Sequence, residues 1–270
     1  MFPKAGVRCN VESNSQISGV FFRLEVAWPG AVPQPGQFFM CRLLPSAVFL
    51  PRAISFETFY IDPGGAKRLS FLIARKGKAT EAFALLKKGD VVELRGPLGN
   101  SWLTVMPRNP PKPIALIGGN AGIAPLTALA CAVKAQNLFH FYAGFRTEKN
   151  TLPLALLLTP AAASAVIACI ASEAGKPRKK MFGAERVKGR IPDFVNYTGY
   201  SAVFACGSGP MLAAIAGHCR QSSTPCYVSL ERPMACGTGA CLGCAVQTRN
   251  GNKRCCVEGP IFPAEELVFE

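Results

Sequence analysis

The chain has 270 residues, of which 49% are hydrophobic and 17% are charged, so it can form a sizeable folded core and is not a disordered protein. Its 30 Lys and Arg against 16 Asp and Glu give a formal net charge of +14, which favours an acidic partner such as a nucleotide or an acidic protein. The densest basic run, KPRKK at 176–180, contains no aromatic residues, so we expect no nucleic-acid partner.

The beginning of the sequence lacks the layout of a secretory signal, because Pro3 and Gly6 interrupt it. We therefore expect a cytoplasmic protein, in which most of the 12 cysteines are reduced thiols. The stretch 151–172 carries no formal charge and could be mistaken for a membrane span, but Pro153 and Pro160 interrupt it. We expect no membrane span.

The first hundred residues contain short apolar or alternating runs separated by Gly and Pro turns, which is typical of a small antiparallel β-barrel. One helix is expected over 80–88, with Thr80 as its N-cap and Gly89 just past its end. The expected strands cover 20–28, 37–43, 50–56, 68–75 and 90–99.

From about residue 112 the pattern changes to strand, glycine turn and helix. This alternation predicts a doubly wound parallel sheet covered on both faces, which binds ligands beyond the carboxyl ends of its strands. The expected strands cover 113–119, 138–145, 165–171 and 200–207, and the expected helices cover 126–135, 152–158 and 209–220.

The last part of the chain is rich in cysteine. Cys236, Cys241 and Cys244 form a C-x4-C-x2-C pattern, and a fourth thiol is available at Cys255 or Cys256. This spacing, followed by a distant cysteine, is the plant-type arrangement for a [2Fe–2S] cluster, whereas structural zinc sites usually use C-x2-C pairs. Zinc is the alternative, and a disulfide is disfavoured in a reducing compartment.

The residues between these cysteines are small, which also favours a cluster. Gly237, Gly239 and Gly243 permit unusual backbone angles and let amide groups approach the inorganic sulfides.

These patterns predict an α+β multidomain protein with three parts. Residues 1–108 form the antiparallel β-barrel, 109–225 form the α/β domain with the doubly wound parallel sheet, and 226–270 form a small cysteine module.

The segments ERPMACGTGACLGCAV at 231–246 and GNKRCCVEGPIFPAEELVF at 251–269 resemble the C-terminal module of the electron-transfer subunits of bacterial type B dihydroorotate dehydrogenases. In that family the last cluster ligand stands three residues before a Gly-Pro pair, and Cys256 occupies that position here. The resemblance implies that the ligands of the [2Fe–2S] cluster are Cys236, Cys241, Cys244 and Cys256.

The barrel resembles the flavin domain of ferredoxin-reductase-like proteins in LPRAISF at 50–56, PGQFF at 35–39 and GPLGNSW at 96–102. The resemblance implies that FAD binds here, with Arg52 on its diphosphate and Ser55 near its reactive ring. The sequence departs from the pattern, with Ala where the family has Pro after the Arg, Ile-Ala for Tyr-Arg, and Ala for Gly. The implied FAD contacts are Arg52, Ala53, Ile54, Ser55, Leu72, Ile73, Ala74, Ala79 and Thr80.

The α/β part resembles the nucleotide domain of the same superfamily in ALIGGNAGIAPL at 115–126 and FACGSGPML at 204–212, with Asn120 and Ala124 in place of the usual Gly and Pro. The resemblance implies NAD(H) binding, and it favours NADH although the basic run could attract an extra phosphate. Cys206 has an equal interpretation as a buried strand cysteine, and ordinary packing or solvation is expected for His140 and His218. The implied NAD contacts are Gly118, Gly119, Gly122, Pro125, Cys206, Gly207 and Pro210.

As a whole, the resemblance implies an electron-transfer subunit of pyrimidine biosynthesis that serves an FMN-containing dihydroorotate dehydrogenase catalytic subunit in a heterotetramer of two plus two. No catalytic acid or base is required of the chain, whose contribution is orientation and electrostatic tuning. One alternative is an equivalent subunit of another redox complex, such as a transhydrogenase, sulfide dehydrogenase or hydrogenase. The other is a zinc-stabilised binding module without redox activity.

Overall fold

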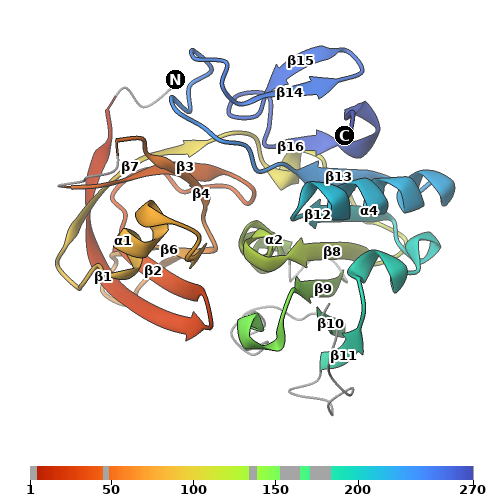
Figure 1. Ribbon diagram of the computed structural model, residues 1–270, viewed down its shortest axis with the longest axis horizontal. Helices are drawn as coiled ribbons and strands as arrows, with labels where there is room; N and C mark the ends of the chain where they lie inside the picture. Colours follow the sequence, from red (N-terminus) through yellow and green to blue (C-terminus); the bar gives the residue numbers. More distant parts are fainter. Residues whose placement is uncertain (1–4, 45–48, 134–138, 153–164, 171–183, 270) are drawn as a thin grey trace.

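The structure is a computed structural model that describes residues 5–44, 49–133, 139–152, 165–170 and 184–269. Within them, the strands form two seven-stranded sheets and a two-stranded hairpin (Figure 1). The helix expected at 152–158 falls almost entirely outside the described residues, and the basic run at 176–180 falls outside them entirely.

The N-terminal sheet is antiparallel, has the strand order β4-β3-β7-β1-β2-β6-β5, and curves into a barrel (Figure 1). Its centre is aromatic, because the Phe39 ring meets Trp28 and Phe71 edge to face at centroid distances of 5.0 and 5.7 Å. All expected strands of this part are confirmed. The bounds are β1 Val7–Ser18, β2 Phe21–Ala27, β3 Phe38–Leu43, β4 Arg52–Ser55, β5 Thr58–Ile61, β6 Lys67–Ala74 and β7 Val91–Leu98.

The single helix of the barrel, α1, runs over Lys78–Ala84 and so begins and ends earlier than expected. The prediction of Thr80 as its N-cap is wrong, because Gly77 is the N-cap and Thr80 lies in the first turn. The Thr80 hydroxyl instead reaches back and accepts hydrogen bonds from the amides of Lys76 and Gly77 at 2.8 and 3.1 Å. Thr80 thereby holds the turn between β6 and α1.

The second sheet has the order β11-β10-β9-β8-β12-β13-β16, in which all neighbours are parallel except β13 and β16. The chain moves outward from β8 to β11 and then returns to the other side of β8, so the order reverses between β8 and β12. The predicted doubly wound parallel sheet is confirmed. Its strands are β8 Ile114–Gly119, β9 Phe139–Phe145, β10 Ala165–Ile170, β11 Ala184–Lys188, β12 Ala202–Cys206, β13 Cys226–Ser229 and β16 Ile261–Pro263.

Helices cover both faces of this sheet. One apolar cluster packs α2, Ile123–Val133, against Ile114 and Leu116 of β8, and another packs α4, Gly209–Gln221, against Ala115 and Ile117. The alternation along β8 therefore sends its side chains to the two helices in turn. α2 begins three residues before the expected position, because the glycine turn winds directly into the helix.

The cysteine-rich segment lies across the barrel and the second sheet (Figure 1). It leaves the sheet after β13, forms the hairpin of β14 Ala245–Thr248 and β15 Gly251–Arg254, and re-enters the sheet as β16. Asn100 of the barrel fastens its return: the side-chain amide donates to the carbonyls of Glu258 and Ile261 and accepts from the Ile261 amide. The backbone N–H of Asn100 also donates to the Gly259 carbonyl, at 2.7 Å.

Short 3-10 helices complete the described secondary structure. They are η1 Trp102–Thr104, η2 Asn120–Gly122, η3 Glu148–Asn150, η4 Ile191–Asp193, η5 Tyr197–Gly199 and η6 Ala264–Glu266.

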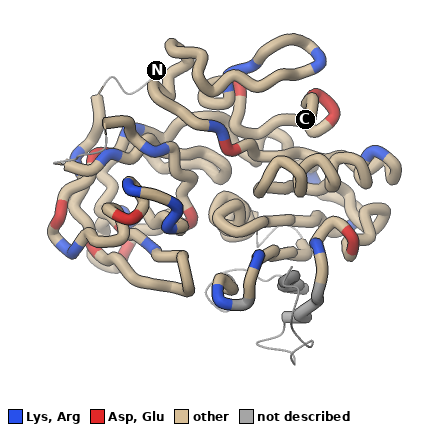
Figure 2. Tube along the Cα trace, viewed as in Figure 1, with Lys and Arg blue, Asp and Glu red and all other residues tan. Residues whose placement is uncertain are grey.

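Within the described residues, Lys and Arg are spread over many segments (Figure 2). None of the helices in the described part has the length and apolarity that a bilayer crossing requires.

A buried ion pair fixes the segment that follows β4. The Glu57 side chain is fully buried, and its two oxygens accept from the Arg23 guanidinium, each at 2.6 Å. We expect Glu57→Gln to destabilise the fold by about 2 kcal/mol, because it leaves a half-buried cation unpaired. Urea unfolding measures this.

The matched control is Glu81→Gln, since Glu81 lies 3.7 Å from Arg75 in an exposed pair. This substitution is expected to cost less than about 1 kcal/mol. Equal losses for both variants would show that burial of the Glu57 pair adds nothing.

Candidate functional site

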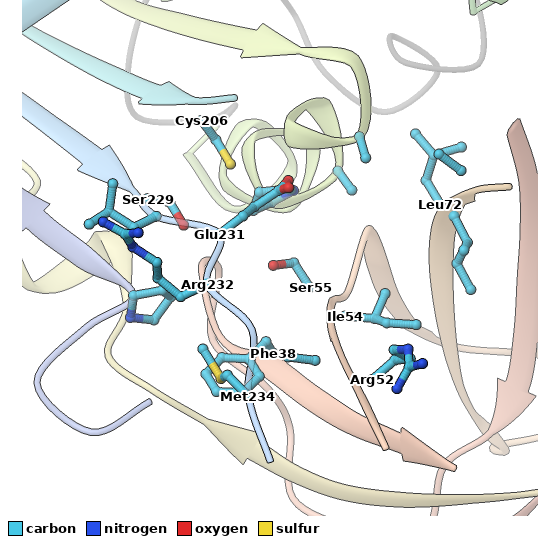
Figure 3. Close-up of a pocket in the computed structure, with 18 of the residues that line it drawn as sticks. Phe38, Arg52, Ile54, Ser55, Leu72, Cys206, Ser229, Glu231, Arg232 and Met234 are labelled. Carbon is cyan, nitrogen blue, oxygen red and sulfur yellow. The ribbon is translucent and has the colours of Figure 1, made fainter. Parts of the chain in front are cut away.

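A cavity of about 260 Å³ lies between the barrel and the parallel sheet (Figure 3). Figure 3 shows Ser55 on the barrel side of this space, and Cys206 and Glu231 on the opposite side. The barrel supplies Phe38, Arg52, Ala53, Ile54, Ser55, Leu72, Ile73, Ala74, Lys76 and Thr80; the parallel sheet and its first turn supply Ala121, Ala124, Pro125, Cys206 and Ser229; the cysteine-rich segment supplies Leu230, Glu231, Arg232, Met234 and Pro260.

The structure brings the expected flavin residues together at this cavity. All of them line it except Ala79, which is buried in the barrel. Arg52 and Lys76 bring two cations to its wall, and Arg52 is oriented by a 2.8 Å hydrogen bond from Nη1 to the Leu50 carbonyl. Two cations on the barrel side of the cavity suit a diphosphate.

Sequence reasoning missed part of the wall. Glu231, Arg232 and Met234 line the cavity although the sequence associated them only with the cysteine module, and Lys76 was not singled out. The signal was available in one respect, because Met234 stands two residues before Cys236. The cavity wall thus continues directly into the cysteine pattern.

Cys206 is the last residue of β12. It was expected either to border a ligand site or to be a buried strand cysteine, and it is both buried and part of a cavity wall. It lines the cavity, yet its residue is only 2% exposed, and this burial raises the pKa of its thiol. A buried thiol of this kind stays protonated and acts as a small apolar wall.

A second cavity, of about 390 Å³, lies beyond the carboxyl ends of β8, β9 and β11. Gly119 and Pro210 of the expected nucleotide residues line it, whereas Pro125 and Cys206 line the first cavity. Gly207 lines a third, smaller cavity beside Leu230 and Arg232. Five of the seven expected nucleotide residues are therefore divided among three cavities near the point where the strand order reverses.

Gly118 and Gly122 line neither the first nor the second cavity. A Cβ on Gly122 would stand 2.3 Å from the Cys206 carbonyl oxygen, and one on Gly118 would stand 2.8 Å from Ile123 Cγ1. These two glycines allow the turn after β8 to pack against the end of β12, which is a structural requirement of its own.

The two histidines lie outside the lining of these cavities. His140 Nδ1 is 2.8 Å from the Tyr200 hydroxyl, and the His218 ring stacks on Tyr197 at a centroid distance of 5.2 Å. Both side chains have packing roles, as expected.

In the cysteine loop, amide groups surround the first thiol. Cys236 Sγ accepts from the amides of Thr238 and Cys241 at 3.4 and 3.5 Å. Burial acts to raise the pKa of the Cys236 thiol, but these hydrogen bonds outweigh it and hold the pKa at about 6. Gly237 and Gly239 make the turn possible, with φ of 67° and 84° in the left-handed region.

Of the two adjacent cysteines that follow β15, Cys256 faces this loop and Cys255 does not. Cys256 forms a thiol hydrogen bond with Cys244, and burial and this bond raise the pKa of Cys256 to about 12. Cys255 turns the other way and donates from Sγ to the Leu230 carbonyl at 3.3 Å. Burial raises its pKa to about 12 as well.

The thiols are therefore arranged as two pairs, Cys236 with Cys241 and Cys244 with Cys256. Among the described residues, no group of three or more His, Cys, Asp and Glu side chains is placed to hold a metal ion. A two-iron cluster takes two protein ligands on each iron, so two thiol pairs, with amides directed at sulfur, fit such a group.

Residues 231–268 match the family model described as the iron–sulfur cluster binding domain of dihydroorotate dehydrogenase B. Over nearly its whole length the chain is similar to curated proteins named dihydroorotate dehydrogenase B (NAD(+)), electron transfer subunit. The protein of Caldanaerobacter subterraneus subsp. tengcongensis is 32% identical, with 97% of this chain and 98% of that protein covered. The protein of Clostridium acetobutylicum is 31% identical, with 96% of each covered.

Solved structures share the fold at lower identity. The structure of NADH-dependent reduced ferredoxin-NADP oxidoreductase, reported for flavin-based electron bifurcation, superposes with a TM-score of 0.79 at 23% identity, covering 97% of this chain and 90% of that one. The ferredoxin reductase of carbazole 1,9a-dioxygenase superposes with a TM-score of 0.64 at 20% identity, covering 82% and 67%. The predicted combination of a flavin-type barrel with a parallel nucleotide sheet is thereby confirmed at the level of the fold.

The opposite orientations of Cys255 and Cys256 give a matched pair of substitutions. We expect Cys256→Ser to lose most of the bound iron and its visible absorbance, because it removes one member of a thiol pair. Cys255→Ser is expected to retain both, since its thiol bonds to a backbone carbonyl that a hydroxyl also satisfies. Iron and sulfide analysis after anaerobic purification measures this, and the reverse result would exchange the two residues.

Proposed function

The chain belongs to the family of dihydroorotate dehydrogenase B electron transfer subunits, and we propose that it passes electrons from NADH through FAD and a [2Fe–2S] cluster to a flavin-containing catalytic subunit. That subunit binds FMN and interconverts dihydroorotate and orotate in pyrimidine biosynthesis. The assembly contains two copies of each subunit and resides in the cytoplasm, where the thiols stay reduced.

Each of the three parts of the chain binds one of the three cofactors. Residues 1–108 hold FAD, 109–225 hold NADH, and 226–270 hold the cluster, with Cys236, Cys241, Cys244 and Cys256 as its ligands. The third part also lends β13 and β16 to the parallel sheet, which keeps it in register with the nucleotide site.

The observation that carries the proposal is the shared wall of the first cavity. Ser55 of the barrel, Cys206 of the parallel sheet and Met234 of the cysteine-rich segment all line this one space. A flavin ring held there contacts all three parts of the chain. Such a position is what transfer between a dinucleotide and a cluster requires, because proximity and orientation dominate the rate.

Bound FAD supplies the conversion between the paired electrons of NADH and the single electrons that an iron–sulfur cluster accepts. The chain's own residues bind and orient. Arg52 and Lys76 hold the diphosphate, Ser55 and Cys206 border the ring, and Gly119 and Pro210 bring the dinucleotide to the carboxyl ends of the strands.

The alternatives are distinguished by composition and by partner. The match of residues 231–268 to an iron–sulfur binding model supports the cluster over structural zinc. An equivalent role in another redox complex requires the same cofactors and differs in the enzyme that co-purifies with the chain.

The isolated, cofactor-loaded chain is expected to reduce ferricyanide with NADH and to leave dihydroorotate unchanged, because it contains the relay but not the catalytic subunit. Added catalytic subunit is expected to restore NAD(+)-linked turnover of dihydroorotate. Steady-state absorbance assays measure both activities. Turnover of dihydroorotate by the chain alone contradicts the proposal, as does a preparation that contains zinc but neither flavin nor iron.

A further inference from the structure

Strand β7 of the barrel packs against the loop that carries Cys236, the first cysteine of the pattern. A Cβ on Gly237 would stand 2.7 Å from Cγ of Met40 and 3.2 Å from Cδ1 of Leu98, so the loop packs closely on β3 and β7. Arg95 is placed at this contact, since it lies on β7 opposite Met40 in the strand register.

The Arg95 side chain reaches the loop itself. Its Nη2 donates to the Cys236 carbonyl, which belongs to the first residue of the cysteine pattern. Its Nε is buried and has no hydrogen-bond partner among the described residues. Nη2 of the guanidinium thus bonds to the loop, while its Nε is shielded from water and has no acceptor in the described part of the chain.

The charge of Arg95 is also uncompensated by any ion pair in the described part of the chain. Arg254 offers the contrast, because it also approaches the loop, 3.5 Å from the Gly239 carbonyl, but its guanidinium is paired with Glu258. Of these two arginines at the loop, Arg95 is therefore the one whose charge has no acidic partner among the described residues.

We propose that Arg95 is a positioning residue that raises the reduction potential of the iron–sulfur cluster and holds Cys236 on the barrel. The proposal rests on the proposed function, because it requires that the thiols bind the cluster. A cluster held by four thiolates is negatively charged and gains one further negative charge when one electron reduces it. A half-buried cation beside its ligand loop stabilises the reduced form more than the oxidised form.

The same contact also holds the cysteine loop in a fixed position relative to the flavin cavity. Phe38, at the start of β3, lines the flavin cavity, and Met40, two residues further, supports Gly237. Arg95 joins the neighbouring strand to the preceding residue of the loop. The cavity and the cysteine loop are thus attached to the same pair of strands.

The test is a redox titration of the cofactor-loaded chain, with the cluster followed by electron paramagnetic resonance and the flavin by absorbance. Arg95→Gln is expected to make the one-electron reduction of the cluster about tenfold less favourable, which corresponds to a shift of about 59 mV to a more negative potential. The flavin potential is expected to stay unchanged. Arg95→Lys keeps the charge and is expected to remain close to the wild-type potential.

The matched control is Arg42→Gln, which removes the same charge from an exposed position on β3, opposite Glu93 in the register. An Arg95→Gln cluster with the wild-type potential overturns the proposal, and so does an equal shift in Arg42→Gln or in Arg95→Lys. Arg95→Gln could fail to bind a cluster at all. In that case a cluster in Arg95→Lys supports the role of the charge. If neither variant binds a cluster, the proposal is overturned in favour of a purely structural contact. A wild-type chain without flavin and cluster refutes the proposed function instead.

Discussion

The arrangement of the sites depends on the attachment of the cysteine-rich segment to the barrel through Asn100. This one side chain bonds to the backbone at Glu258 and Ile261, on both sides of Gly259 and Pro260. The attachment holds the segment that leads into β16, whereas the backbone hydrogen bond from Cys255 to the Cys244 carbonyl sets the two ends of the hairpin side by side. It also places Pro260 in the wall of the first cavity. Together with the contact of Arg95 with Cys236, it ties the thiols and the cavity to the same barrel.

The second constraint is the reversal of strand order between β8 and β12. Gly118 and Cys206 are register partners at the carboxyl ends of these strands, and Gly122 packs against the Cys206 carbonyl. The turn after β8 can approach so closely only because these positions lack a side chain. The first and second cavities open on either side of this junction, so a flavin and a dinucleotide bound as we propose would lie next to each other without a long connecting segment.

Much of this could be predicted from the sequence, because local spacing encodes it. The C-x4-C-x2-C pattern needs only one loop, and the strand and helix rhythm of the parallel sheet follows from buried runs between glycine turns. β1 was missed because its polar residues, such as Glu12 and Asn14, hide the buried Cys9 and Val11. Contacts between distant segments could not be predicted either, and nothing near Arg95 in the sequence indicates its contact with Cys236. The hydrogen bond from the Lys76 amide to Thr80 spans only four residues, but the local pattern that suggests an N-cap does not distinguish it from a residue in the first turn.

In the proposed function, one chain connects a dinucleotide, a flavin and an iron–sulfur cluster electronically. Anaerobic titration of the purified chain with NADH, followed by visible absorbance and electron paramagnetic resonance, is the sharpest test of this connection. We expect flavin absorbance to be lost and the resonance of a reduced [2Fe–2S] cluster to grow in the same titration. Loss of flavin absorbance while the cluster stays oxidised, although dithionite reduces it, would contradict the claim.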